Sequence, residues 1–99
     1  MATLQIEHAI TDLDVWITAF GRFEQGRVDA GVRGQRICQV SNAPHVLVIE
    51  LDFDDAEAAA RFEGFLRTQV WSSPDRAPAL VGSPETRILE PIDIARATS

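Results

Sequence analysis

The side chain in this sequence best suited to acid–base chemistry is His8. It lies in an alternating run, Leu4-Gln5-Ile6-Glu7-His8-Ala9-Ile10, and shares the apolar side of that run with Ile6 and Ile10. An imidazole changes charge near neutral pH, which makes His8 a candidate general base or ligand anchor. The alternative is a core histidine whose ring is satisfied by a backbone carbonyl or a carboxylate. The sequence leaves both interpretations open.

Large apolar side chains at strand and helix spacing are expected around His8. The residues that we expect to line a small-molecule pocket with it are Ile6, Trp16, Phe20, Leu51, Phe62, Leu66 and Trp71. The same aromatic side chains serve equally well as the packing of a filled core. A cavity of at least ~300 Å³ that reaches His8 favours a ligand site, whereas a filled interior favours a non-catalytic scaffold or sensor.

No residue combination predicts a metal site, a bound cofactor or a covalent nucleophile. His8 and His45 fall far apart in the expected sheet. Asp52, Asp54 and Asp55 precede a helix, where N-terminal capping explains them. No Gly-rich phosphate loop, Ser-His-Asp order or Cys-His pair can be assembled. The single cysteine, Cys38, is expected to be a buried structural thiol on a strand.

The elements that must position these residues come in two similar halves. At an offset of 43 residues, Leu4 aligns with Leu47 and Asp12 with Asp55. In each half an alternating strand is followed by a helix. The first helix is expected to begin at the capping box Thr11-x-x-Asp14 and the second at the capping box Asp54-x-x-Glu57. The first helix should fray between residues 26 and 31, and the second should close at Trp71. The expected strands cover residues 3–10, 32–40, a segment ending at residue 53, and 86–90. The Pro-rich residues 72–85 form a long loop, a candidate lid.

The order β-α-β-β-α-β predicts a ferredoxin-like α+β sandwich with an antiparallel sheet of order 4-1-3-2 and both helices on one face. We expect the first and third strands to lie side by side in the centre and to run parallel. Residues 1–92 should form this single domain, followed by a flexible tail over residues 93–99.

The sheet face opposite the helices mixes apolar and charged side chains. It is too apolar for free solvent and too polar for a core, which favours a homodimer with this face buried between two copies. The residues expected at that interface are Gln5, Glu7, Val48 and Glu50. Glu7 and Glu50 would need partners there, and those expected are Arg33, Arg36 and Arg87. The alternative is a set of solvated charges on an open sheet.

The chain also resembles the dimeric α+β barrel superfamily, which includes antibiotic-biosynthesis monooxygenases, haem-degrading enzymes, muconolactone isomerases and polyketide cyclases. The runs that carry the resemblance are Asp14-Val15-Trp16 with Phe20, Arg27 and Ala30-Gly31-Val32, and then residues 43–54. The resemblance implies a cofactor-independent monooxygenase- or cyclase-like activity on an aromatic or polyketide-like substrate. In the haem-degrading branch a first-strand Asn and a His after the helical Trp are needed. The chain has neither, so that activity is not expected.

Composition excludes several classes of partner. Over 99 residues the net charge is −6, which argues against nucleic acid and against an anionic membrane surface. No apolar run approaches the ~20 residues of a membrane span, and no secretory signal opens the chain. A cytoplasmic protein with an apolar or aromatic ligand is therefore expected.

Overall fold

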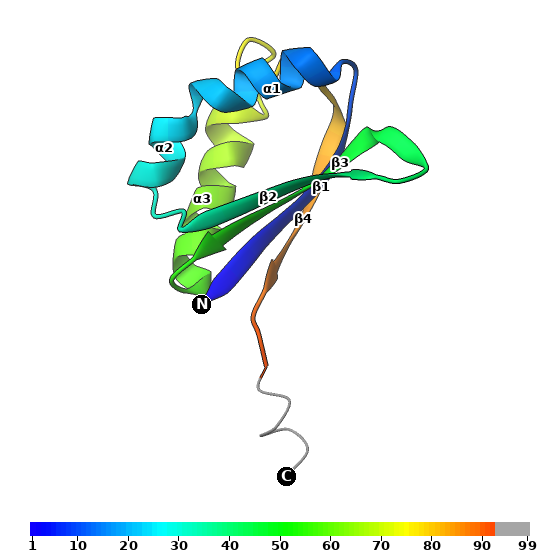
Figure 1. The fold of residues 1–99 in the computed structure, drawn as a ribbon. Helices are drawn as coiled ribbons and strands as arrows, with labels where there is room; N and C mark the ends of the chain where they lie inside the picture. The colour runs from blue at the N-terminus through cyan, green and yellow to red at the C-terminus, as the bar shows by residue number, and fades with distance from the viewer. Residues whose placement is uncertain (93–99) are drawn as a thin grey trace.

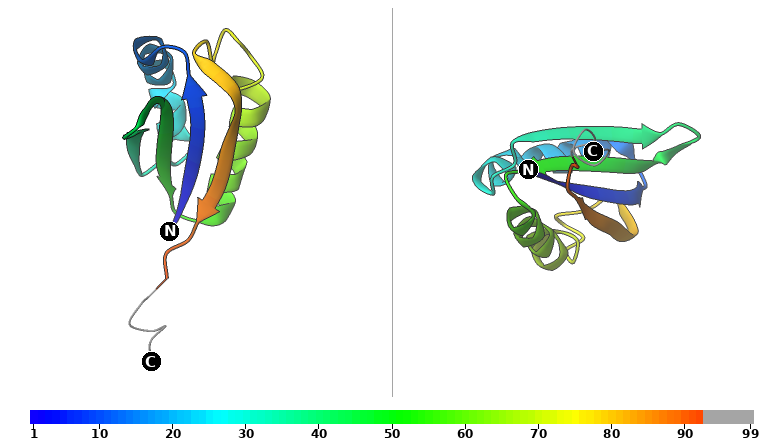
Figure 2. Two further views of the ribbon diagram at one scale, coloured as in Figure 1. Left: turned by 90° about the vertical axis from the view of Figure 1, so that its right-hand side faces the viewer. Right: turned by 90° about the horizontal axis from the view of Figure 1, so that it is seen from below.

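The computed structural model describes residues 1–92, and the tail expected over residues 93–99 lies outside that range. Its elements are β1 (Ala2–Ile10), α1 (Leu13–Arg22), α2 (Glu24–Asp29), β2 (Gly34–Val40), β3 (Ala43–Phe53), α3 (Ala56–Phe65), the π-helical turn η1 (Leu66–Val70) and β4 (Leu80–Leu89). One face of the sheet carries all the helices, and the other is uncovered (Figures 1 and 2). No helix within residues 1–92 is long and apolar enough to cross a membrane.

The four strands pair in the order β2-β3-β1-β4, which confirms the predicted ferredoxin-like sheet. The parallel pairing expected for the two central strands is wrong, since β1 and β3 are antiparallel. The physical reason is the tight β2–β3 hairpin through Ser41 and Asn42. The helical crossover brings β2 back in the direction of β1, and the hairpin then reverses the chain before it pairs with β1.

Strand alternation sets the core as predicted. The helix-facing side chains of β1 from Leu4 to Ile10 and of β3 from Leu47 to Phe53 are all buried, with exposed fractions of 7% or less: Leu4, Ile6, His8, Ile10, Leu47, Ile49, Leu51 and Phe53. From the other side α3 contributes Ala59 and Phe62. Burying this set of apolar side chains is the main favourable term for the fold, since each full burial contributes about 1.5–3 kcal/mol.

The helix starts lie one residue later than the predicted capping boxes. Asp12 caps α1 by accepting from the Val15 amide at 2.9 Å, and Asp55 caps α3 by accepting from the Ala58 amide at 2.8 Å. Both caps have an extended backbone, as an N-cap requires. These two residues are also the pair that the internal repeat aligns. Asp54 instead forms a surface ion pair with Arg33.

The last strand is longer than predicted, and the loop before it is shorter. β4 begins at Leu80 rather than at residue 86, so the connection after η1 covers only residues 71–79. Gly82, at φ +70°, and Pro84 suggest a loop by residue type. Both are tolerated because β4 is an edge strand whose register against β1 shifts between Glu7 and Ala9.

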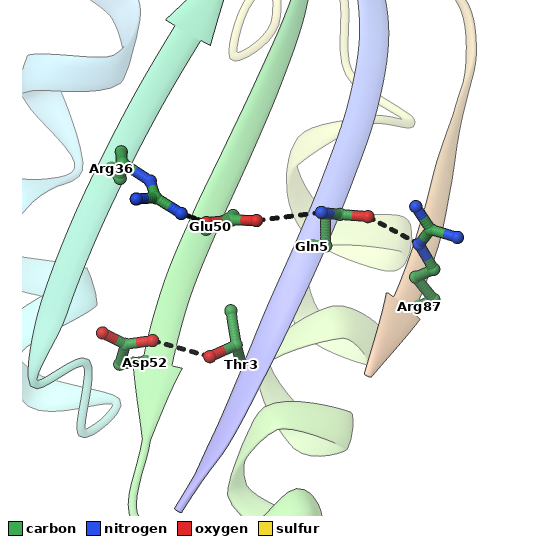
Figure 3. A network of polar contacts seen from close by, with 6 residues as sticks. All are labelled: Thr3, Gln5, Arg36, Glu50, Asp52 and Arg87. Atoms are coloured by element: carbon green, nitrogen blue, oxygen red, sulfur yellow. Dashed lines mark hydrogen bonds and ion pairs between the residues drawn. The ribbon is translucent and has the colours of Figure 1, made fainter. Parts of the chain in front are cut away.

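The uncovered face carries a polar row across all four strands. Arg36 on β2 bonds Glu50 on β3, Glu50 accepts from Gln5 on β1 at 2.9 Å, and Gln5 accepts from Arg87 on β4 (Figure 3). A second contact beside it joins Thr3 and Asp52. Cys38 lies opposite Val48 on this face and is exposed, so the expectation of a buried thiol is wrong. The reason is that the helices cover only the opposite side of β2.

Candidate functional site

A cavity of about 90 Å³ lies between the sheet, the helices and the 71–79 connection. Its walls include every residue predicted for the pocket: Ile6, His8, Trp16, Phe20, Leu51, Phe62, Leu66 and Trp71. Its lining is mostly apolar, and among the buried residues that line it only His8 and Arg27 are polar or charged. The structure thus brings the predicted residues together around one space. Their roles stay a proposal.

His8 is 7% exposed and is held by one hydrogen bond, between Nδ1 and the backbone carbonyl of its neighbour Ala9 at 3.1 Å. A carbonyl only accepts, so Nδ1 must carry the proton, and in the neutral ring Nε2 is left with a free lone pair. Burial lowers the pKa of His8, an effect that the Ala9 carbonyl partly offsets. The ring is therefore kept neutral at pH 7, in the form that can accept a proton.

A row of aromatic rings leads from His8 along α1. The His8 and Trp16 rings lie 6.1 Å apart, and the Trp16 and Phe20 rings stack at 4.7 Å. At the far end, the Arg27 guanidinium lies 3.6 Å above the Phe20 ring. The two buried polar residues of the cavity therefore stand at opposite ends of one row of aromatic rings.

Sequence reasoning did not single out Arg27 as a site residue. Its Nη1 donates to the Phe20 carbonyl at 2.6 Å and its Nε to the Gln35 side chain at 3.2 Å. The signal was present: residues 16, 20, 23 and 27 continue one apolar helical stripe, and a charge on such a stripe is unusual. Because the sequence predicts that the helix frays after residue 26, it gives Arg27 no fixed position on this stripe. The chain instead breaks at Phe23 and restarts as α2, which turns Arg27 toward the cavity.

The opposite wall of the cavity is formed by α3, by η1 and by the 71–79 connection that follows them. Phe62 projects from α3, Leu66 and Val70 from η1, and Trp71 follows directly. The Trp71 amide bonds the Leu66 carbonyl at 2.7 Å, the wide spacing of a π-helical turn, which is frequent at functional sites. Ala79 closes the wall, fixed by a bond from the Thr11 amide to its carbonyl at 2.9 Å.

The size of the cavity matters for both interpretations of the sequence. It reaches His8, as a ligand site requires, but at about 90 Å³ it is smaller than the ~300 Å³ typical of a drug-sized ligand. A molecule much larger than one ring fits only if the 71–79 connection moves or if part of the molecule stays in solvent.

Within residues 1–92 no three His, Cys, Asp or Glu side chains gather as a metal site would require. His45 lies at the solvent-exposed start of β3, and Asp52 on the uncovered face bonds Thr3. The charged or titratable residues in the lining of the cavity are His8, the buried Arg27 and the exposed Arg76, and an imidazole and guanidinium groups suit proton transfer and anion binding.

Comparison with other proteins adds the fold and nothing finer. No family model and no curated protein matches the sequence. Among solved structures, an antibiotic biosynthesis monooxygenase superposes with a TM-score of 0.65 at 9% identity, over 94% of this chain and 100% of that one. The chain has the ferredoxin-like α+β fold.

Two further ferredoxin-like neighbours extend the comparison. An uncharacterized NIPSNAP domain protein from Burkholderia xenovorans gives a TM-score of 0.61 at 21% identity, over 95% of this chain and 97% of the other. A dimeric ferredoxin-like protein from an uncultured marine organism gives 0.66 at 11% identity, over 94% and 96%. At these identities the ferredoxin-like fold is shared, while substrate and reaction are not carried over.

Proposed function

We propose that this protein binds a small aromatic molecule between its sheet and helices, and that His8 accepts a proton from it. The observation that carries the proposal is the state of the His8 ring. Its Nδ1–H is committed to the Ala9 carbonyl, and its Nε2 has no hydrogen-bond partner within residues 1–92. No side-chain nitrogen in that range is both fully buried and unpaired, so Nε2 keeps contact with the cavity space.

The chemistry is a proton transfer from an acidic O–H or C–H of the ligand to Nε2. In an oxygenase, the carbanion left on the ligand would add to dioxygen, and the proton held by His8 would complete a hydroperoxide. The O–O bond would then break as the same carbon loses its second hydrogen, so that one oxygen atom stays as a carbonyl and the other leaves as water. In a cyclase, the carbanion would attack a carbonyl carbon of the same molecule. The oxygenase is favoured by the fold shared with an antibiotic biosynthesis monooxygenase. Neither route requires a metal or a resident cofactor.

The walls set what the ligand can be. A cavity of about 90 Å³ accepts a single ring, lying against Trp16 and Phe20. The lid function expected of residues 72–85 now rests on the 71–79 connection, whose residues 76–79 line the cavity. Displacing it would admit the larger polyketide-like molecules.

Both tryptophans of the chain, Trp16 and Trp71, line the cavity, so intrinsic fluorescence reports on it directly. Titration with benzamide, a neutral single-ring probe, should quench this fluorescence. The cavity-filling variant Leu66→Phe should abolish the response, whereas Val15→Phe, on the exposed side of α1, should keep it. Equal quenching in all three proteins would contradict binding in the cavity.

Catalysis is tested at His8 itself. With a substrate identified from a mass that co-purifies in native mass spectrometry, His8→Ala should lower the rate by on the order of 10²–10⁴-fold, as is typical for loss of a general base. An unchanged rate would remove His8 from the reaction.

A second candidate, a ligand-free scaffold, is favoured by one observation, the small volume of the cavity. In that case the rings fill the core and His8 is structural. A protein that shows no bound mass, no quenching by benzamide and a clear loss of stability with Leu66→Phe, as overpacking of a filled core causes, would support the scaffold and contradict the ligand site.

For either function, the proposed assembly is a homodimer through the uncovered face. Within residues 1–92, Glu50 and Gln5 are already paired with Arg36 and Arg87, whereas Glu7 lies directly opposite Glu85 on the next strand. Like charges so placed are unfavourable, and a second copy offers arginines to relieve them. That a neighbour with this fold is a dimer supports the arrangement. A monomer by native mass spectrometry would contradict it.

A further inference from the structure

The most unusual charge in the molecule is Arg27. Its side chain is only 6% exposed, and no carboxylate within residues 1–92 forms an ion pair with it. Buried charges in proteins are normally paired or bound to a ligand. Glu24, one helical turn earlier, is exposed and makes no contact within ion-pair distance. Burial accordingly lowers the pKa of the Arg27 guanidinium, and Glu24 only partly offsets this.

The contacts of Arg27 satisfy part of its hydrogen-bonding capacity. A guanidinium has five N–H donors, and two of them are used by the Phe20 carbonyl and the Gln35 amide oxygen. The Nη2 group has no partner within residues 1–92, and it is not sealed away, because no fully buried side-chain nitrogen there is unpaired. The guanidinium lines the cavity, so the free donors are available to a molecule inside it.

One structural role of Arg27 is already visible. The Phe20 carbonyl belongs to the last turn of α1, and a cation there offsets the partial negative charge of the helix end. This role needs Nη1 alone. It explains neither the free Nη2 donors nor the position of a buried charge on a largely apolar cavity wall.

The geometry points to Arg27 as the anchor for the carboxylate of an aromatic acid, whose ring lies along Phe20 and Trp16 with its far end toward His8. A carboxylate matches the two nitrogens at the guanidinium tip, and the pairing would supply the countercharge that residues 1–92 do not provide. The ring would lie in the cavity beside the Phe20 and Trp16 rings, between the two polar groups. This inference rests on the proposed function and adds the class of ligand to it.

The test compares two probes of nearly identical shape and different charge, benzoate and benzamide, by quenching of Trp16 and Trp71. In the unmodified protein benzoate should bind about 10–100-fold more tightly, the range expected for hydrogen bonds to a charged group. Arg27→Gln should remove this preference, so that the ratio of the two affinities falls to about one. Arg27→Lys keeps the charge without the planar fork and should keep part of the preference.

The outcomes separate the two proposals. If both probes bind equally to the unmodified protein, the cavity binds aromatics and the carboxylate anchor is wrong. If neither binds, the proposed function fails and the anchor with it. If Arg27→Gln keeps the preference for benzoate, the anion is held elsewhere and the anchor is again wrong.

Because Arg27 also supports the end of α1, its variants could fail to fold. A second measurement therefore uses the unmodified protein. The side-chain N–H resonances of Arg27 in a ¹⁵N-labelled sample should shift and sharpen on addition of benzoate and stay unchanged with benzamide. The same change with both probes, or with neither, would overturn the inference.

Discussion

Replacing His8 with phenylalanine separates a functional histidine from a purely structural one. Phenylalanine keeps an aromatic ring of similar shape beside Trp16, removes the Nε2 base and cannot be charged. The cavity that His8 borders gives the slightly larger ring room to settle. If His8 is kept for chemistry rather than for packing, this substitution should preserve or raise the stability of the fold while it abolishes proton transfer.

The magnitude at pH 7.5 follows from two terms. Losing the bond between Nδ1 and the Ala9 carbonyl costs about 0.5–1.5 kcal/mol, as is typical of a neutral hydrogen bond. A fully buried phenyl ring contributes about 1.5–3 kcal/mol, part of which the imidazole ring already supplies. We therefore expect His8→Phe to raise the free energy of unfolding by about 0–2 kcal/mol and Tm by up to roughly 10 °C.

The difference should grow as the pH falls. Burial lowers the pKa of His8 below its ordinary value of 6.5, so the unfolded chain takes up this proton first. Above pH 6.5 the residue makes no pH-dependent contribution. Below it, the unmodified protein loses stability until the pH passes the folded-state pKa, at a slope of at most about 1.4 kcal/mol per pH unit. The phenylalanine variant escapes this loss.

The assay is urea unfolding of both proteins between pH 8 and pH 5. His45→Gln serves as the control for the other, exposed histidine. Two results would refute the reasoning: a gap between the unmodified protein and His8→Phe that stays constant across this range, or a loss of more than about 1 kcal/mol at pH 7.5. The second would show that packing around the imidazole, rather than chemistry, requires a histidine.

Three further predictions concern the sheet. Cys38 is exposed on the uncovered face, so a thiol reagent should modify it in dilute protein and more slowly at concentrations where the proposed dimer forms; equal rates at all concentrations would contradict that interface. The hydrogen bond from Gln5 and the contact with Arg36 lower the pKa of Glu50, so this carboxylate stabilises the fold above about pH 4.5 and stops doing so as the pH falls through its folded-state pKa. Glu50→Gln should therefore make the free energy of unfolding depend less on pH at acid pH. An unchanged dependence would contradict the network. Leu51→Ala, at 1% exposure, should cost about 2–5 kcal/mol in urea unfolding, and a loss below 1 kcal/mol would mean that the core repacks around it.

The sequence predicts the fold well where one interaction dominates. Period-two alternation in β1 and β3 sorts apolar from polar side chains, and burial of the apolar set determines the face, so the core of the sheet is predicted residue by residue. Element ends are predicted less well, since a cap or an edge strand depends on neighbours. Pro84 reads as a loop residue, and only the edge position of β4 makes it compatible with a strand.

The candidate site shows the same division. Its apolar lining follows from helical and strand periodicity, and all seven predicted lining residues border the cavity together with His8. Arg27 could not be placed in the same way, because its position depends on the break at Phe23, where the backbone leaves the helix at φ −102° and ψ 14°. A helix that continued straight would carry Arg27 along the axis of α1, away from the Phe20 carbonyl.

The break at Phe23 therefore connects the fold to the proposed chemistry. Because α1 ends at Arg22, the Phe20 carbonyl lies in its last turn, where the Arg27 side chain bonds it and the guanidinium lies over the Phe20 ring. Strand alternation alone places His8 at the other end of this row of rings, next to Trp16. A domain of this size has little stability to spare. A buried cation that no carboxylate of residues 1–92 pairs with and a buried imidazole at reduced pKa both lower that stability. Two such residues around one apolar cavity are better explained by a ligand that carries a negative charge and an acidic proton than by the needs of packing.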